Sequence, residues 1–459
     1  MTDECMRRLI VIYLLTVVAL LPIVAAEYSG TLPVIHLRTN GEITSKTDYV
    51  SGTCYIDAMG VNELEGLGSE ALQVPVLVRG RGNWTWTDFD KKSYKLKFIS
   101  AQEPLGMPKN RHFALLANAD GYKAAFFRAA AGFKLGEMLG LEFTPKQQPV
   151  ELMLNGEYMG LYMLTETIRV DENRVDITEQ ADGETDRQLI TGGWLVEIDN
   201  GVNDHQIRGN VANTSLLYWL ITYHSPEKLS SLQLTYLRTQ VNSILRAVYV
   251  NDKNSTQWEE LIDMEVLVRF YIVHEMLDNV EGFLGSCYMY KDVGETKWKF
   301  GPLWDLGHAF NTWHEKNRFI YDYSNGWEPC IMGEIAQFPR FQERLRQVWM
   351  ENYKQLYDEL EVYLNDFAAY IVEAMVCDHR RWPGYSVADA QDAVKHCLAL
   401  FDEKRTFLTS QWGGKNSGVE QLRVVPRTSV KSYNLNGQRL DSRCWRGIYI
   451  QNGKKYIKK

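Results

Sequence analysis

Three carboxylates mark the stretch from Asp278 to Phe310 as a place where chemistry could occur. Asp278 and Glu281 lie in a predicted loop after a helix, and two short aromatic strands separate them from Asp305. Phosphoryl-transfer sites place a base in a loop before one strand and a metal-binding acid after the next. The order of these residues therefore predicts a site that combines a proton acceptor with a metal ligand.

Residues 79–86 (RGRGNWTW) and 91–98 (KKSYKLKF) could supply the positive charge that a phosphate group needs. Glycines let the backbone approach a ligand closely and favour anion-binding turns. Along the predicted strand Lys95 and Lys97 share one face, while Lys92 shares the other face with apolar side chains. The pattern fits a phosphate site, and it also fits a solvated strand with a basic outer face.

The elements that must position these residues begin as β-structure. Residues 31–78 alternate short apolar runs with turns, and Asn40-Gly41 predicts a tight hairpin. A second hairpin is predicted around Asn155-Gly156, with its later strand ending at Glu166. The first part of the chain is therefore expected to be an antiparallel β-rich region.

A further strand is predicted at residues 192–199, where Glu197 and Asp199 alternate onto one face. Side chains two residues apart on a strand stand ~7 Å apart, which would suit the two carboxylates of a glycoside hydrolase. Nothing else in the sequence marks a sugar-binding site. Solvated strand carboxylates remain the simpler interpretation of this pair.

Helices dominate the rest of the chain. Residues 122–139 have helical spacing, with Asp120 as a possible cap, and Arg128 either reaches the surface or pairs with an internal carboxylate. Residues 225–249 and 263–279 form two more predicted helices, the second capped by Asp263. Two or three long helices are expected between residues 341 and 412, so the fold class is α+β.

Composition and the N-terminus bear on where the protein works. The chain has 459 residues and a formal net charge of −8, which argues against nucleic acid as a partner. Arg7 and Arg8, an apolar run and Ala25-Ala26 form the pattern of a signal peptide over residues 1–26. The mature chain is therefore expected to be exported, secreted or held at the cell surface, without a stable transmembrane anchor.

The cysteines and the C-terminus say less about what the protein does. Six cysteines follow the predicted signal peptide without a CxxC pair, which leaves one or two disulfides possible. Residues 413–418 form a predicted linker, and residues 419–459 form a small β unit. This unit resembles the C-terminal sorting or attachment domains of secreted proteins from Bacteroidetes-type bacteria.

Five motifs in order, RGRGNWTW, KKSYKLKF, GEYMGLYMLTE, GGWLVEID and CYMYKD…WKFGPLWDLG, resemble the CotH kinase family (spore coat protein H type). The resemblance covers residues 32–412 and defines a predicted domain over residues 27–412. It implies a protein-kinase-like bilobal fold with an antiparallel β-rich N-lobe and a helical C-lobe. It also implies a secreted atypical protein kinase that transfers the ATP γ-phosphate, with Mg²⁺ or Mn²⁺, to Ser or Thr of an extracytoplasmic protein.

The same resemblance assigns roles to individual residues. Arg81, Lys92 and Lys97 would contact the phosphates of ATP, since lysine and arginine both suit that task. Glu166 would lie near the adenine or pair with one of those lysines. Asp305 would hold the metal ion.

The acid loop departs from the family pattern. Relatives commonly show Asn-x-Asp with a second Asn five residues after the Asp, whereas this chain has Glu281 at the position of the base and Ser286 at that of the second Asn. Asp278 is an alternative base. The departure also favours a rival hypothesis, in which the chain is a catalytically silent binding or scaffold protein at the cell surface.

Overall fold

The structure is a computed structural model that describes residues 28–61, 64–199, 201, 205–210, 218–322 and 330–413, together with three short strands near the C-terminus. The predicted signal peptide, most of the predicted linker and Cys444 lie outside the described residues. Among the helices it describes, none is both long and apolar enough to cross a membrane.

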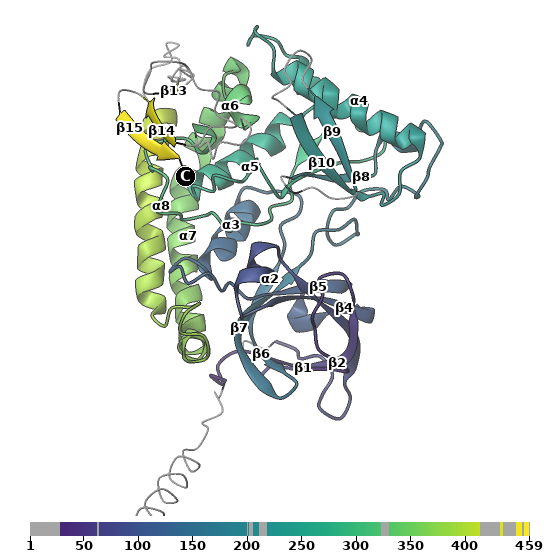
Figure 1. Cartoon of the computed structure of the whole chain (residues 1–459), viewed down its shortest axis with the longest axis vertical. Helices are drawn as coiled ribbons and strands as arrows, with labels where there is room; N and C mark the ends of the chain where they lie inside the picture. Colours follow the sequence, from purple (N-terminus) through teal and green to yellow (C-terminus); the bar gives the residue numbers. More distant parts are fainter. Residues whose placement is uncertain are drawn as a thin grey trace, which may run out of the picture.

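Seven strands of the N-terminal half close into a barrel (Figure 1). Neighbouring strands run antiparallel except for the first and sixth, which pair in parallel and close the ring. The expected antiparallel β-rich region is therefore present, but its strands close into a barrel, which differs from the kinase-like N-lobe that the family resemblance implies. Closure removes exposed strand edges. In chain order the strands are β1 (Val34–Thr39), β2 (Val50–Asp57), β3 (Val74–Arg81), β4 (Ser93–Gln102), β5 (Asn110–Leu116), β6 (Gln147–Leu154) and β7 (Glu157–Glu166).

Alternation along β4 separates the inside of the barrel from its outer face. Tyr94, Leu96 and Phe98 are buried inside, at 1–4% exposure, whereas Lys95 and Lys97 are half-buried on the outer face. Successive strand side chains point to opposite faces, so the predicted split of the two lysines from the apolar residues is confirmed.

The two predicted hairpins have different outcomes. Asn155 and Gly156 join β6 to β7 with φ values of 53° and 86°, the left-handed pair that a two-residue hairpin turn requires. The tight turn predicted at Asn40-Gly41 is wrong, because β1 ends at Thr39 and β2 begins only at Val50. The intervening residues form a longer connection.

A second, wholly antiparallel sheet has the order β12-β11-β8-β10-β9. Its strands are β8 (Trp194–Asp199), β9 (Gln206–Asn210), β10 (Tyr218–Ser225), β11 (Cys287–Lys291) and β12 (Lys299–Phe300). The predicted strands β8, β11 and β12 are confirmed, while β9 and β10 were not predicted. Helix α4 (Ser231–Val248) covers one face of this sheet (Figure 1).

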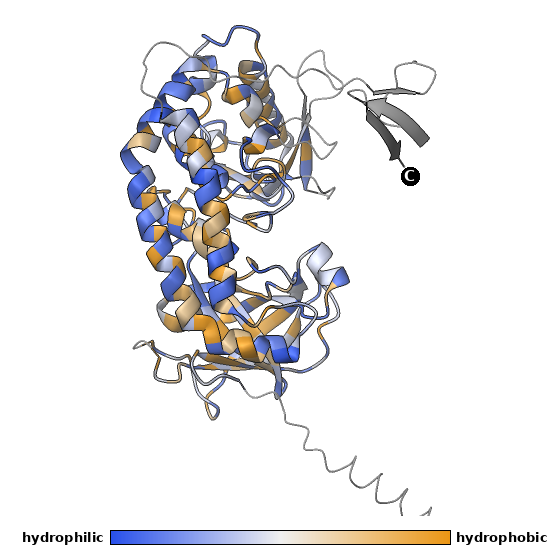
Figure 2. Cartoon of the chain, turned by 90° about the vertical axis from the view of Figure 1, so that its left-hand side faces the viewer, coloured by the Kyte–Doolittle hydropathy of each residue, from blue (hydrophilic) through white to orange (hydrophobic). Residues whose placement is uncertain are grey.

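The helices connect the two β units. Helix α7 (Pro339–Arg381) runs beside α8 (Ala390–Trp412) along one edge of the molecule and packs against β7, α3 and α5 (Figures 1 and 2). Asp263 caps α5 as predicted, by accepting from Val266 N. The other helices are α2 (Trp84–Asp88), α3 (Phe127–Met138), α5 (Met264–Met276) and α6 (Met332–Ile335).

A buried ion pair attaches the barrel to α7. Lys91 Nζ lies 2.7 Å from Asp378 Oδ1, and both side chains are fully buried. Lys91 also donates to the carbonyl oxygens of Ala117 and Leu161, and the same Asp378 oxygen accepts from Leu161 N. Lys91 therefore has a structural role in joining these two parts.

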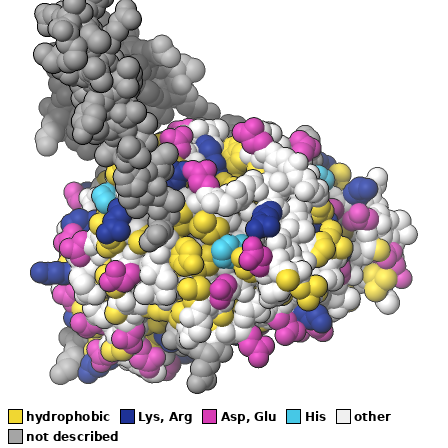
Figure 3. Space-filling view, turned by 90° about the horizontal axis from the view of Figure 1, so that it is seen from below, with side chains coloured by type: hydrophobic (Ala, Val, Ile, Leu, Met, Phe, Trp, Pro, Cys, Tyr) yellow, Lys and Arg dark blue, Asp and Glu magenta, His cyan; other side chains and the backbone are white. Residues whose placement is uncertain are grey.

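The C-terminal strands β13 (Ser432–Asn434), β14 (Gly447–Gln451) and β15 (Lys454–Lys458) form a small antiparallel sheet. Cys54, Cys287, Cys377 and Cys397 carry free thiols, so none of these four forms a disulfide. Figure 3 shows basic, acidic and hydrophobic side chains interspersed on the face viewed from below.

Candidate active site

The stretch from Asp278 to Phe310 has unusual backbone geometry. Asp278, Ser286, Asp305 and Phe310 all have positive φ, between 46° and 52°. This left-handed conformation is uncommon for residues other than glycine, and such residues cluster at functional sites. The tight turns place both acid-bearing segments beside each other, and Phe310 N donates to Leu277 O at 2.8 Å.

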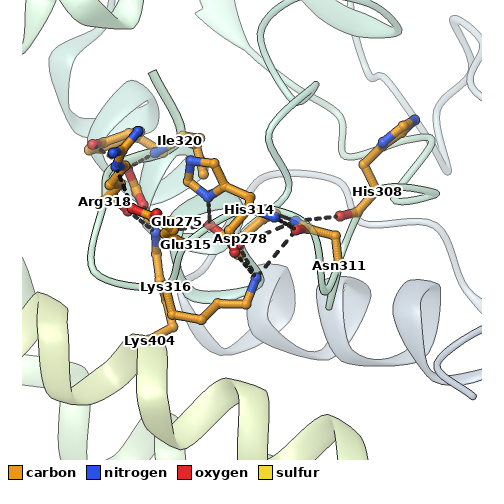
Figure 4. A network of polar contacts seen from close by, with 11 residues as sticks. Glu275, Asp278, His308, Asn311, His314, Glu315, Lys316, Arg318, Ile320 and Lys404 are labelled. Atoms are coloured by element: carbon orange, nitrogen blue, oxygen red, sulfur yellow. Dashed lines mark hydrogen bonds and ion pairs between the residues drawn. The ribbon is translucent and has the colours of Figure 1, made fainter. Parts of the chain in front are cut away.

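Asp278 is the centre of a buried polar network (Figure 4). Its carboxylate accepts from His314 Nδ1 at 2.9 Å, from Lys404 Nζ at 3.0 Å and from Lys316 Nζ. Asn311 Nδ2 donates to the same carboxylate at 3.2 Å. The network holds the segment after Asp305 and helix α8 against the acid loop.

The network also fixes the charge of Asp278. Burial alone would raise its pKa, but His314, Lys404 and Lys316 outweigh burial and hold the pKa well below its usual range. The side chain is 2% exposed. These contacts make Asp278 an anchor of the loop; its predicted role as a base stays a prediction.

Glu281 occupies a more open position in the same loop. Its side chain is 31% exposed, and Oε2 lies 3.1 Å from His308 Nε2. The His308 side chain points away from the Asp278 network (Figure 4). His308 was not predicted as a functional residue, although it lies only three residues after Asp305 in the chain.

Arg128 links α3 to the segment after Asp305. It pairs with Asp120 and donates from Nε to Ala309 O at 3.1 Å. The predicted pairing of Arg128 with a carboxylate is therefore confirmed, whereas the cap predicted for Asp120 is wrong, since α3 begins after Phe126 without a side-chain cap. Asp120 instead holds the arginine.

Arg81 and Asp305 come together where the barrel meets the second sheet, a region called the junction below. Burial lowers the pKa of the Arg81 guanidinium. The charge of Asp305 opposes that effect, and the charge of Tyr288 opposes it to a smaller extent. The guanidinium carbon lies 4.9 Å from the ring centroid of Trp304. Arg81 Nη1 is buried and makes no hydrogen bond within the described structure, so it lacks the partner that a buried donor normally has.

Three more cations share the outer face of β3 and β4 with Arg81. Arg79 lies directly opposite Lys95 in the ladder, and Arg79 and Lys97 both lie over Tyr49, at 5.3 and 5.9 Å from its ring centroid. None of the four cations has a carboxylate within 4 Å in the described part of the chain. Like charges opposite each other destabilise a sheet, so this face carries an unneutralised positive charge.

The crowding of positive charge changes the titration of this face. Burial and the charges of Arg79 and Arg169 lower the pKa of Lys95 to about 8. Burial and the same cationic neighbourhood lower the pKa of His112 to about 3, so His112 is neutral at pH 7. An anion bound here would relieve this repulsion.

A family model described as CotH kinase protein matches residues 78–408, more than half of the chain. The chain belongs to the CotH kinase family. The match begins near the end of β3 and ends within α8, so β1 and β2 precede it. It includes every predicted site residue. No curated protein matches the chain at the significance required.

Two residues to which the CotH resemblance assigned nucleotide contacts lie apart from Arg81. Lys92 donates to Trp86 O at 2.6 Å and lines a cavity of about 460 Å³ with Tyr94 at the barrel. Glu166 is buried, accepts from Lys146 N at 3.0 Å and lies 3.6 Å from Arg174 Nε. The structure thus groups Arg81 and Lys97 on one face, while the nucleotide contacts of Lys92 and Glu166 stay predictions.

Side chains of the second sheet also lie at the junction. Glu197 Oε2 lies 2.7 Å from His224 Nε2, and Glu197 is directly opposite Tyr288 in the ladder. Burial, followed by the charge of Glu197, raises the pKa of Tyr288 well above 10. Asp199 accepts from Thr222 Oγ1 at 3.3 Å. Glu197 and Asp199 thus each have a partner within the second sheet.

Asp305 has the properties of a carboxylate that binds metal together with a phosphate. It is exposed, and among the described residues only its Oδ1 has a partner, Gly307 N at 3.3 Å. The described residues contain no group of three or more His, Cys, Asp or Glu arranged to hold a metal ion. Mg²⁺ commonly takes one or two protein carboxylates and completes its shell with phosphate and water, so the donor set fits such a site.

Proposed function

We propose that this CotH family member is a secreted, metal-dependent protein kinase that binds ATP at the junction. The observation that carries the proposal is the placement of Arg81, with an unpaired buried Nη1, over the ring of Trp304 and so beside the exposed carboxylate of Asp305. Cations on one side and a free carboxylate on the other suit a metal–triphosphate. The family match supports the kinase-like class.

The phosphates would lie along the outer face of β3 and β4. Arg81 and Lys97 stay as the proposed phosphate ligands, and Lys95 and Arg79 join them because they share that face. Lys92 faces the barrel interior and is a weaker candidate. The barrel would thus correspond to the nucleotide-binding lobe of a bilobal kinase, and the second sheet with its helices to the other lobe.

Asp305 would hold Mg²⁺ or Mn²⁺, which would neutralise charge on the β- and γ-phosphates. Its second carboxylate oxygen has no protein partner in the described structure, which leaves it available as a ligand. Ser286, at the position of the second metal ligand of the relatives, has a neutral hydroxyl, so Asp305 would carry most of the charge on the protein side.

Glu281 is the proposed base. The acceptor hydroxyl oxygen attacks the γ-phosphorus, the bond to the β,γ-bridging oxygen breaks, and ADP leaves with that electron pair. The proton of the hydroxyl passes to the Glu281 carboxylate, which His308 orients at 3.1 Å. Asp278 positions the loop that bears Glu281.

The proposed acceptor is a Ser or Thr of an extracytoplasmic protein. The predicted signal peptide supports this location, because the pattern of Arg7, Arg8, an apolar run and Ala25-Ala26 is typical of exported proteins. The acceptor would reach Glu281 from the exposed side of the acid loop.

Transfer of labelled γ-phosphate tests the proposal. Purified mature chain with ATP and Mg²⁺ or Mn²⁺ is expected to label itself or a generic protein acceptor on Ser or Thr. Asp305→Asn should lose the label, while Glu260→Gln, an exposed acid away from the junction, should keep it. Labelling that persists in Asp305→Asn would refute the site.

A silent nucleotide-binding or scaffold protein is the second candidate. It is favoured by the full engagement of Asp278 by His314, Lys316 and Lys404, together with Ser286 in place of Asn. ATP binding without transfer to any acceptor, including itself, would favour this function over catalysis.

A further inference from the structure

A cavity of about 850 Å³ lies against the second sheet, on the face opposite the junction. Its wall includes Lys291 of β11, Tyr236 and Gln240 of α4, and Glu260 of a short 3-10 helix (Gln257–Glu260). Lys291 and Tyr288 are three residues apart on one strand, so they point to opposite faces of the sheet. The cavity is therefore separate from the proposed nucleotide site.

Lys291 is buried in this wall at 2% exposure, and among the described residues its ammonium hydrogen-bonds only to neutral groups. Nζ donates to Tyr236 Oη at 2.7 Å and to Gln240 Oε1 at 3.5 Å. The Tyr236 hydroxyl donates its own hydrogen bond to Thr191 O at 2.9 Å. An ammonium has three N–H donors, so these two partners leave one donor unused.

Aromatic rings surround the same ammonium. Nζ lies 5.2 Å from the ring centroid of Tyr236 and 5.7 Å from that of Trp298. Cation–π contacts of this kind compensate partly for lost hydration, without cancelling the charge. Burial lowers the pKa of Lys291 to about 8, and the charge of Glu295 opposes that effect.

Other buried lysines differ from Lys291 in that each forms an ion pair with a carboxylate. In the described part of the chain, Lys91 pairs with Asp378, Lys316 pairs with Asp278, and Lys404 pairs with Glu275 and Asp278. Lys291 is as buried as they are, yet no carboxylate lies within 4 Å of it among those residues. A buried charge that lacks a partner is costly, which is why such groups are usually paired.

We propose that this cavity is a second ligand site, in which Lys291 binds the carboxylate of a small organic monocarboxylate with an apolar or aromatic body. The volume lies in the range of small-molecule sites, and Tyr236 offers a ring against which such a body could pack. The ligand carboxylate would take the third N–H and supply the counter-ion that the fold omits.

The carboxylates around the cavity disfavour a doubly charged anion. Glu259, Glu260 and Glu295 also line it, with Lys297 as a second cation at the rim. Glu259 is held by Arg340, and Glu295 by Lys299. These carboxylates would repel a phosphate dianion more strongly than a carboxylate.

Calorimetric titration of the mature chain with 3-phenylpropionate and with its uncharged amide tests the proposal. The carboxylate is expected to bind at least about tenfold more tightly than the amide, because a hydrogen bond to a charged group contributes about 1.5–3 kcal/mol. Inorganic phosphate should bind more weakly than 3-phenylpropionate. The affinity of the carboxylate should fall as the pH rises from 7 to 9, as Lys291 loses its proton.

Lys291→Met is the decisive variant, and Lys109→Met, at an exposed lysine that does not line the cavity, is its control. Lys291→Met should lose at least about tenfold in affinity for 3-phenylpropionate, and Lys109→Met should leave the affinity unchanged. Equal affinity in the wild type and Lys291→Met would overturn the proposal. So would the absence of saturable binding of 3-phenylpropionate to the wild type up to about 10 mM, the weak end of affinities for fragments of this size.

Stability gives an independent measurement. Lys291→Met removes an uncompensated buried charge at similar volume, so it should raise the Tm at pH 7, whereas an ordinary structural lysine would lower it. The gain should shrink as the pH rises towards 10, where the folded chain already carries a neutral Lys291. A lower Tm for a folded Lys291→Met chain would contradict the proposal.

Discussion

The guanidinium of Arg81 lies close to Asp305: Arg81 ends β3 and lies over the ring of Trp304, the residue before Asp305. Arg81 and Asp305 form no ion pair within 4 Å, although the charge of Asp305 opposes the lowering of the Arg81 pKa by burial. Arg81 Nη1 stays without a hydrogen bond, and one oxygen of Asp305 has no protein partner in the described structure. A metal-bound triphosphate could therefore contact Arg81 through its phosphates and Asp305 through its metal ion.

Asp278→Asn is expected to destabilise the chain severely. The substitution leaves Lys404, Lys316 and His314 around a neutral amide, and removing one partner of a buried ion pair costs about 3–5 kcal/mol. Urea unfolding measures the loss, and Asp305→Asn is the matched control because Asp305 is exposed. Equal stability of the two variants would contradict the anchoring role of Asp278.

The same aspartate predicts a pH dependence. The pKa of Asp278 is lower in the folded chain than its usual value of 3.8, so its contribution to the free energy of unfolding is complete at neutral pH. That contribution should decline as the pH falls below about 4. Urea unfolding of the wild type at several acidic pH values measures the decline, which should be smaller in Asp278→Asn if that variant folds.

Nucleotide affinity should weaken as the pH rises from 7 to 9. The pKa of Lys95 is lowered to about 8, so the face of β3 and β4 loses a positive charge in this range unless a phosphate holds the proton. Lys95→Arg should retain affinity at pH 9, because arginine stays charged. A binding titration at both pH values decides the matter, and identical pH profiles for the two chains would remove Lys95 from the phosphate site.

Glu281→Gln should reduce kcat by about 10²–10⁴-fold while leaving nucleotide affinity nearly unchanged, since a base acts on the acceptor hydroxyl rather than on ATP. The transfer assay and a binding titration on the same preparation separate the two effects. A retained kcat would exclude Glu281 as the base. Loss of affinity alone would make it a binding residue.

Lys91→Met should be more harmful alone than together with Asp378→Leu. Each single change leaves a charge buried at the boundary between the barrel and α7, at a cost of about 3–5 kcal/mol, whereas the double change leaves none. A double-mutant cycle by urea unfolding measures the coupling. Additive losses would show that the pair does not join the two parts as described.

The sequence predicted elements with strong local signals. The Asn155-Gly156 turn, the alternation around Lys95 and Lys97, and the Asp263 cap all follow from local backbone chemistry, which a short window contains. The Asn40-Gly41 turn failed because tertiary contacts, among them β2 pairing with β3, determine where β2 begins. Local propensity does not contain that information.

The sequence predicted which residues belong to the candidate site better than it predicted how they contact one another. Asp305 and Arg81 stood out by type and neighbours, but their approach depends on how the barrel meets the second sheet. The contacts of Asp278 could not be predicted, because Lys404 and His314 lie far along the chain and come close to Asp278 only in the folded structure. Closure of the barrel by parallel pairing of β1 with β6 was equally non-local.

The most direct test of the central claim is the affinity of a non-hydrolysable ATP analogue, measured with and without Mg²⁺ on the wild type, Asp305→Asn and Arg81→Leu. Asp305→Asn should lose at least about tenfold in the presence of Mg²⁺ and little in its absence, since it removes a metal ligand. Arg81→Leu should lose affinity in both conditions. Unchanged Mg²⁺-dependent affinity in Asp305→Asn would contradict the assignment of the junction as the nucleotide site.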